Sequence, residues 1–264
     1  MQVATAQLAA QSDEDRVAVT GSSVVVLDGA SSFSADGKAA GAYVDVLSRE
    51  LVRRLQDDRA ELPTILSSAI ATTAARLSLQ PGSAPSSTVA IFRVNEHNIE
   101  ILILGDSMAV IGVNDGNYEV VVDERLTELN LPESKLYRSR LQAGRGYDDT
   151  HHAILAALQR AERFYRNTEG GYWIAEADPA AANHSLTGSY PRKSAGWAIL
   201  ATDGAAEPLA AMGIPWPEVA QMNEGALSNL LVRCREWESV EDPDGRLCPR
   251  SKRHDDKSIA VIRF

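Results

Sequence analysis

The chain has 264 residues, 44% hydrophobic and 23% charged, so it is long enough to bury a core and has the composition of a globular rather than a disordered protein. Its 26 Lys and Arg against 36 Asp and Glu give a net charge of −10, and because negative charge repels phosphate backbones we expect no nucleic-acid partner. Two cysteines, an N-terminus without signal-peptide features and the lack of a long apolar run predict a cytoplasmic single domain over 1–264 without a membrane segment.

The secondary-structure signals come in clusters of strands and pairs of helices. The first helix is predicted from Val44, Leu47 and Leu51, which recur at spacings of three and four, and a later one from apolar residues that continue to Phe164. In chain order we predict strands at 17–19 and 24–27, a loop at 30–38, helices at 40–58 and 62–79, strands at 87–94, 98–104 and 108–113, a turn at 114–117, helices within 126–166 broken at 143–146, a strand at 197–202, a helix at 217–237 and a strand at 258–264. This order favours α+β layers over alternating βαβ units.

Acidic residues recur at the ends of the predicted apolar strands. The blocks are Asp13-Glu14-Asp15, Asp28-Gly29, Gly105-Asp106, Asp203-Gly204 and Asp255-Asp256. One Asp-Gly pair after a strand is most often only a turn. If the strand ends converge, however, the carboxylates repel one another unless a cation lies among them, and Mg²⁺ or Mn²⁺ prefers such oxygen ligands. The sequence alone does not establish that the ends meet.

These blocks, with Pro85–Ala90 between the second and the third, resemble the metal-dependent protein phosphatase family of type 2C, the PPM-type Ser/Thr phosphatases, in its compact bacterial form. Their order follows the family order from Asp13 to Val261. The resemblance implies a four-layer α-β-β-α sandwich of two antiparallel sheets flanked by helix pairs. The helices within 40–80 would form one pair, and those at 149–166 and 217–237 would lie in the other layer.

The activity implied by this resemblance is hydrolysis of phosphoserine and phosphothreonine in proteins with two Mn²⁺ or Mg²⁺ ions, on a phosphoprotein such as the product of a Ser/Thr kinase. Asp28 would bridge both metals and Gly29 would offer its backbone carbonyl. Asp203 would hold one metal, as would Asp255, with Asp256 as the neighbour that could substitute. A water activated between two metals needs no nucleophilic side chain, which suits a chain with two cysteines.

Three further acidic residues take outer roles in the same resemblance. Asp15, with Glu14 beside it, would bind metal-coordinated water. Asp106, in a Gly-Asp-Ser block, would shape the floor of the site or help with a third metal.

The sequence departs from the family pattern where the substrate phosphate is gripped. Residues 1–12 contain no Arg or Lys, although family members commonly carry an Arg before the first acidic block. The replacement candidates are Arg16, Lys38 and an Arg within 138–145, each of which could equally be a solvated surface residue. Ala30-Ser31-Ser32 replaces a Gly-rich stretch, and Met108 follows Gly-Asp-Ser where an Arg is usual.

Two other functions therefore stay open. The chain could be a catalytically weak or inactive member of the same fold that binds or senses phosphoproteins, as the missing Arg suggests. A haloacid-dehalogenase-like phosphohydrolase is suggested by Asp28-Gly29, but its chemistry needs a nucleophilic Asp where Val26 stands.

Overall fold

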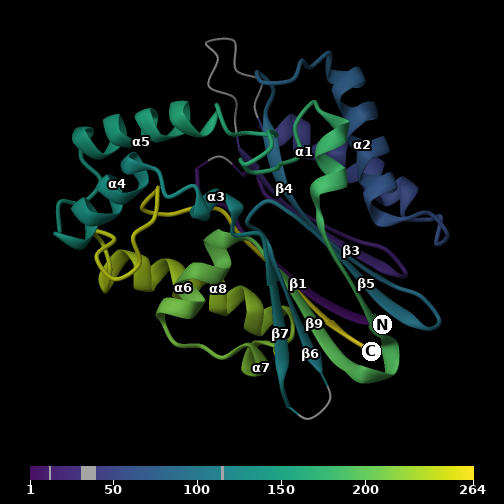
Figure 1. Cartoon of the computed structure of the whole chain (residues 1–264). Helices are drawn as coiled ribbons and strands as arrows, with labels where there is room; N and C mark the ends of the chain where they lie inside the picture. The colour runs from purple at the N-terminus through teal and green to yellow at the C-terminus, as the bar shows by residue number, and fades with distance from the viewer. Residues whose placement is uncertain (12, 31–39, 114–115) are drawn as a thin grey trace.

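Two antiparallel five-stranded sheets form the centre of the protein in the computed structural model, which describes residues 1–11, 13–30, 40–113 and 116–264. The strands are β1 (Gln2–Leu8), β2 (Arg16–Val19), β3 (Ser23–Ala30), β4 (Ser86–Val94), β5 (Asn98–Leu104), β6 (Met108–Val113), β7 (Tyr118–Val122), β8 (Leu186–Pro191), β9 (Ala195–Ala201) and β10 (Lys257–Arg263). One sheet has the order β1-β10-β9-β6-β7 and the other β2-β3-β4-β5-β8. Since β1 pairs with β10, the two ends of the chain lie side by side (Figure 1).

The helices lie outside the sheets and at one end of them (Figure 1). They are α1 (Ala40–Arg54), α2 (Leu62–Leu77), α3 (Arg125–Glu128), α4 (Pro132–Gln142), α5 (Asp149–Glu162), α6 (Asp203–Ala211), α7 (Trp216–Val219) and α8 (Glu224–Val240), with 3-10 turns at Pro179–His184 and Arg192–Ser194. Within the described residues, none of these helices combines the length and the apolar character needed to span a bilayer.

Three hydrophobic clusters define four layers. The helices α1 and α2 bury Leu47 and Leu66 against the outer face of the β2-β3-β4-β5-β8 sheet. On the opposite side, α6 and α8 bury Leu209 and Leu230 against the other sheet. A third cluster, which contains Phe92, fills the space between the two sheets. The arrangement confirms the predicted α+β fold, an α-β-β-α sandwich of two antiparallel sheets flanked by helix pairs.

The prediction of which helices form the second helix layer was wrong. The helix predicted over 149–166 ends at Glu162 and packs against α4 through Leu141 and Leu158 in a separate cluster, away from the sheets. Phe164, expected on its apolar face, is 82% exposed. The partner of α8 is instead α6, which begins at Asp203, where the sequence predicted only a turn.

Three strands escaped prediction, namely β1, β7 and β8. The first of them buries only the small residues Ala4 and Ala6, which carry a weak hydrophobic signal. The predicted loop at 30–38 lies outside the described residues from Ser31 onward, and with it Ser32 and Lys38. Of the predicted turn at 114–117, the first two residues also lie outside the described ranges.

Candidate active site

Four aspartates from separate chain segments approach one another at one end of the sandwich. Asp28 lies within β3, opposite Thr88 of β4, rather than beyond the end of its strand as predicted. Asp203 is the first residue of α6 and is separated from the end of β9 by Thr202 alone, while Asp255 precedes β10 and Asp15 precedes β2. Strands from both sheets therefore carry the carboxylates to one place.

The electrostatic coupling of these carboxyl groups shows how closely they gather. Burial raises the pKa of Asp28 well above its ordinary value, and the charges of Asp15, Asp203 and Asp255 raise it further. The pKa of Asp203 is also raised, first by burial and then by Asp255. The hydrogen bond between the Asp28 and Asp203 side chains raises the pKa of Asp28 and lowers that of Asp203. The structure thus brings together the acidic residues of four predicted blocks.

Asp15 is buried and only partly satisfied. Its side chain is 3% exposed, and its Oδ2 accepts a hydrogen bond of 3.1 Å from the Thr202 hydroxyl, while Oδ1 has no hydrogen-bond partner among the described residues. Burial, followed by the charges of Asp256 and Asp203, raises the pKa of Asp15 to about 7. A buried carboxylate oxygen without a donor is costly, so this edge of the cluster needs a proton, a water or a cation.

Asp255 and Asp256 have different surroundings. Asp256 accepts backbone N–H bonds from Ala10 at 2.5 Å and Glu14 at 2.6 Å, and so fastens the segment that carries Asp15 to the start of β10. Asp255 instead contributes to the charge felt by Asp28 and Asp203, and its Oδ1 accepts a bond of 2.9 Å from Lys252. The backbone of Glu14 is thereby fixed beside the cluster.

Two glycines permit the close approach of these segments. A Cβ on Gly29 would lie 2.7 Å from the Glu14 carbonyl oxygen and 3.0 Å from a methyl group of Val44. A Cβ on Gly204 would lie 2.1 Å from the Asp256 carbonyl oxygen. The Asp-Gly pairs predicted as turns are therefore required by the contacts between segments rather than by turn conformation.

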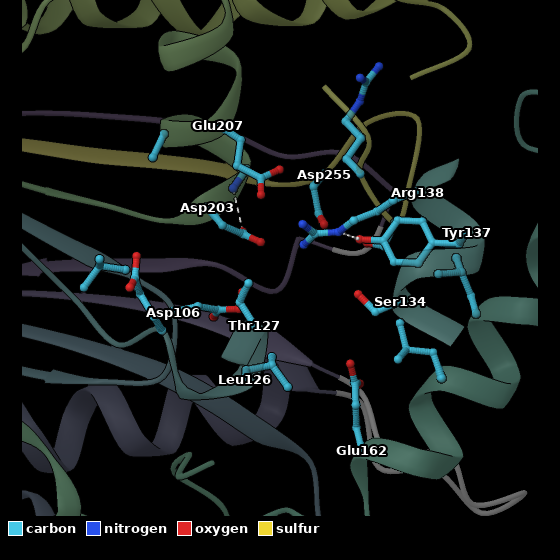
Figure 2. A pocket seen from close by; sticks show the side chains of 18 of the residues that line it. Asp106, Leu126, Thr127, Ser134, Tyr137, Arg138, Glu162, Asp203, Glu207 and Asp255 are labelled. Carbon is cyan, nitrogen blue, oxygen red and sulfur yellow. Dashed lines mark hydrogen bonds between the residues drawn. The ribbon is translucent and has the colours of Figure 1, made fainter. Parts of the chain in front are cut away.

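A cavity of about 390 Å³ opens beside Asp203 and Asp255, between α4, α5 and α6 (Figure 2). Asp106 lies on its wall, as do Glu162 and Glu207. Burial raises the pKa of each of these three groups to about 7, with the charge of Asp203 as the next cause for Asp106 and Glu207. Sequence reasoning missed both glutamates. Glu207 follows Asp203 by four residues, a spacing that would have placed both on one helix face had α6 been predicted.

Arg138 is the cation whose guanidinium enters this acidic cavity. It reaches from α4 toward Asp203 and Asp255 (Figure 2), and its Nε donates to the Tyr137 hydroxyl at 3.2 Å. The second arginine of the lining, Arg250, is already bound to Asp242 and to backbone carbonyls. Of the lining residues, Arg138 therefore has the charge that is free to meet an anion.

Two of the other phosphate-binding candidates, Arg16 and Arg140, are engaged elsewhere. Arg16 binds Asp45 at 2.6 Å and donates to the carbonyls of Asp13 and Asp15, so it supports the backbone of the first acidic block. Within 138–145, Arg140 pairs with Asp148 at 2.8 Å. The structure thus distinguishes Arg138 from Arg140, which the sequence alone does not.

A buried ion pair supports the cluster from below. The Nζ of Lys257 lies 2.6 Å from Oε1 of Glu238 and donates to the Gly204 carbonyl at 2.9 Å, and both side chains are buried. The other oxygen of Glu238 is 2.8 Å from Nδ1 of His254. Glu238 therefore joins α8 to the start of β10, and Lys257 joins the start of β10 to the start of α6.

The donor atoms do not form a closed metal site in this arrangement. Across the described ranges, no group of three or more His, Cys, Asp or Glu side chains is placed so that it could hold a metal ion. The chemistry of the cluster nevertheless suits a hard divalent cation, because its carboxylates repel one another and Asp15 Oδ1 lacks a partner. The donor atoms present thus fit a hard divalent cation by their chemistry.

Comparisons with known proteins agree with the geometry. The family profile described as Protein phosphatase 2C matches residues 9–130, whereas no curated protein sequence matches the chain. The catalytic domain of the Ser/Thr phosphatase PstP in complex with two manganese ions is 15% identical, with a TM-score of 0.58 over 99% of this chain and 97% of that one.

Two further bacterial structures share the fold. Stp1 from Staphylococcus aureus is 13% identical, with a TM-score of 0.58 over 100% of this chain and 94% of that one. The PPM Ser-Thr phosphatase MsPP from Mycobacterium smegmatis, in complex with cacodylate, is 16% identical, with a TM-score of 0.54 over 100% and 98%. Profile and fold together confirm the resemblance to the type 2C, PPM-type Ser/Thr protein phosphatases that the acidic blocks indicate.

Proposed function

We propose that this chain is a metal-dependent phosphatase that hydrolyses phosphoserine and phosphothreonine in proteins. The observation that carries this proposal is the convergence of Asp15, Asp28, Asp203 and Asp255, from four chain segments, beside a cavity that Asp203 and Asp255 line. Buried carboxylates that lie close together repel one another, which is unfavourable without a positive charge among them. The manganese ions of the PstP complex supply the precedent for the cation in this fold.

Each acidic residue would have a distinct part in holding the cations. Asp28, at the centre of the cluster, would be the bridging ligand, with the Gly29 carbonyl as its neighbour. Asp203 and Asp255 would complete the ligand set, while Asp15 and Glu14 would bind the coordinated waters. Two bound Mn²⁺ or Mg²⁺ ions would supply Lewis acidity and lower the pKa of a water between them.

Asp256 and Asp106 would act at the border of the site. Asp256 accepts two backbone N–H bonds, so it would position the segment of Asp15 rather than serve as the first choice of ligand. Asp106 lies on the cavity wall in the field of Asp203, which suits a role on the floor of the site or at a third cation.

Arg138 would bind the phosphoryl oxygens of the substrate. Its guanidinium faces the carboxylates across the cavity, and the Tyr137 hydroxyl steadies it (Figure 2). An arginine presents parallel N–H donors to phosphate oxygens and stays charged at any physiological pH. Arg138 would thus take the phosphate-binding role of the arginine that is missing from residues 1–12.

A binding module that recognises phosphoproteins without turnover is the second candidate. The observation that favours it is the engagement of Arg16 with Asp45, which removes from catalysis the cation nearest in sequence to the first acidic block. Such a module would bind Mn²⁺ and phosphopeptide without releasing phosphate.

Phosphate release from a phosphothreonine peptide in the presence of Mn²⁺ separates the two functions. We expect release by the wild-type protein, abolition by EDTA, and loss in Asp28→Asn and Asp203→Asn. Asp58→Asn is the matched control, because it makes the same charge change at an exposed residue after α1. Binding of metal and peptide with no release from any phosphopeptide would refute the phosphatase assignment.

A further inference from the structure

A second cavity, of about 610 Å³, lies next to the acidic cavity that Asp203 and Asp255 line, and its own lining is mainly basic. Its lining includes Arg235, Lys252, Arg253 and His152, and we refer to it as the basic cavity. The two cavities share Leu155, Ser251 and Asp255 as a common wall. The basic cavity is therefore adjacent to the cavity that Asp203 lines.

The positive charge of the basic cavity is largely uncompensated. Asp255 is the one carboxylate on its lining, and Lys252 binds it at 2.9 Å. Among the described residues, neither Arg235 nor Arg253 forms an ion pair with a carboxylate. The guanidinium of Arg235 donates to the carbonyl of Ala9, and that of Arg253 lies 5.9 Å from the ring centroid of Tyr147. Two guanidinium charges thus stay available in a chain whose net charge is −10.

The backbone that carries Arg253 is fixed by a buried network. The backbone carbonyl of Arg253 accepts a hydrogen bond of 2.9 Å from Arg250, which is itself anchored on buried Asp242 at 2.7 Å. Arg235 projects from α8, whose next turn carries buried Glu238. A positioned cation loses less side-chain entropy on binding an anion than a freely moving one does.

We infer that the basic cavity binds acidic side chains that flank the phosphorylated residue, so that the preferred substrates are phosphopeptides with Asp or Glu close to the phosphorylation site. An extended peptide advances by about 3.4 Å per residue, so residues a few positions from the phosphoresidue can cross the shared wall. The inference rests on the proposed phosphatase function for the phosphate-binding half of the peptide. It runs against the net charge, which taken alone favours basic peptides.

Three phosphothreonine peptides that differ only in their flanking residues test this assignment. We expect the wild-type protein to hydrolyse the peptide with Glu flanks with a KM about tenfold lower than the peptide with Lys flanks, and the peptide with Ser flanks in between. Arg253→Glu should raise the KM for the acidic peptide about tenfold and leave kcat unchanged. Arg233→Glu is the matched control, because it reverses the same charge on an exposed residue of α8 outside both cavities.

Fluorescence polarisation with an unphosphorylated acidic peptide makes the outcome independent of turnover. Binding that Arg253→Glu weakens and Arg233→Glu does not supports the basic cavity, even if no phosphopeptide is hydrolysed and the phosphatase proposal fails. Equal KM values for acidic and basic flanks, or equal losses in both charge-reversal variants, would overturn the assignment.

Discussion

Removing one buried charge from the aspartate cluster should stabilise the metal-free protein. Asp15→Asn is the cleanest perturbation, because the amide has nearly the shape of the carboxylate and its oxygen can still accept from Thr202. The cost that it relieves arises from burial and from the charges of Asp256 and Asp203. Asp15 is 3% exposed, so little of this cost is screened by solvent.

The magnitude and the sign follow from the pKa of Asp15. Folding raises this pKa from 3.8 to about 7, so the folded state binds the proton more tightly and stability is lost as the pH rises from about 4 to about 7. Above pH 7 the full penalty is about 4 kcal/mol, at 1.36 kcal/mol per pKa unit. Because a buried amide also has a cost, we expect Asp15→Asn to gain about 2–4 kcal/mol at pH 8 and almost nothing at pH 4.

Urea unfolding in EDTA, followed by circular dichroism at both pH values, measures this gain. Saturating Mn²⁺ should reverse the order at pH 8, because the cation stabilises the wild-type cluster more than the variant. An Asp15→Asn protein that is less stable than the wild type at pH 8 in EDTA would refute the view that these carboxylates repel one another in the folded state.

The remaining predictions concern the grip on phosphate and the support beneath the cluster. Arg138→Ala should lower kcat/KM for a phosphopeptide about 10- to 100-fold, because a charge-assisted hydrogen bond contributes about 1.5–3 kcal/mol. Arg138→Lys should restore little of this loss, because lysine lacks parallel donors. Steady-state kinetics measures both variants, and full activity of Arg138→Ala would contradict the assignment. Lys257→Met should cost about 3–5 kcal/mol in urea unfolding by leaving Glu238 buried without its ammonium partner, and combination with Glu238→Gln should recover part of the loss. Gly204→Ala places a Cβ 2.1 Å from the Asp256 carbonyl oxygen, so we expect a lower melting temperature and weaker Mn²⁺ binding, whereas wild-type values of both would show that the segments are not packed as described.

The four-layer arrangement was predicted correctly from the sequence, but the helices that form one of the layers were not. The apolar positions Val44, Leu47 and Leu51 are buried on α1 as their spacing indicates, since a helix that covers a sheet needs one continuous apolar face. The helix α5 has a similar spacing, but its apolar residues pack on α4. Periodicity shows that a face is buried and does not show against what, so α5 was wrongly assigned to the sandwich.

The acidic candidates were found because they stand next to apolar runs and follow the family order, although Asp28 lies within β3 rather than beyond its end. Asp203 was recognised in this way, yet the helix that it begins was not, because Asp-Gly after a strand has the composition of a turn. Missing that helix concealed Glu207 one turn later. Arg138 could not be distinguished from Arg140, because their difference lies in long-range contacts, namely the cavity for one and Asp148 for the other.

The most direct test of whether the four aspartates form one cation site is a titration of Mn²⁺ into metal-free protein. Isothermal calorimetry measures the heat of binding, and electron paramagnetic resonance measures the ion that stays free. We predict two bound Mn²⁺ ions per wild-type chain, loss of at least one in Asp28→Asn and in Asp203→Asn, and unchanged binding in Asp58→Asn. Unaltered Mn²⁺ binding in both Asp28→Asn and Asp203→Asn, or no binding by the wild-type protein, would contradict the assignment of the four aspartates to one cation site.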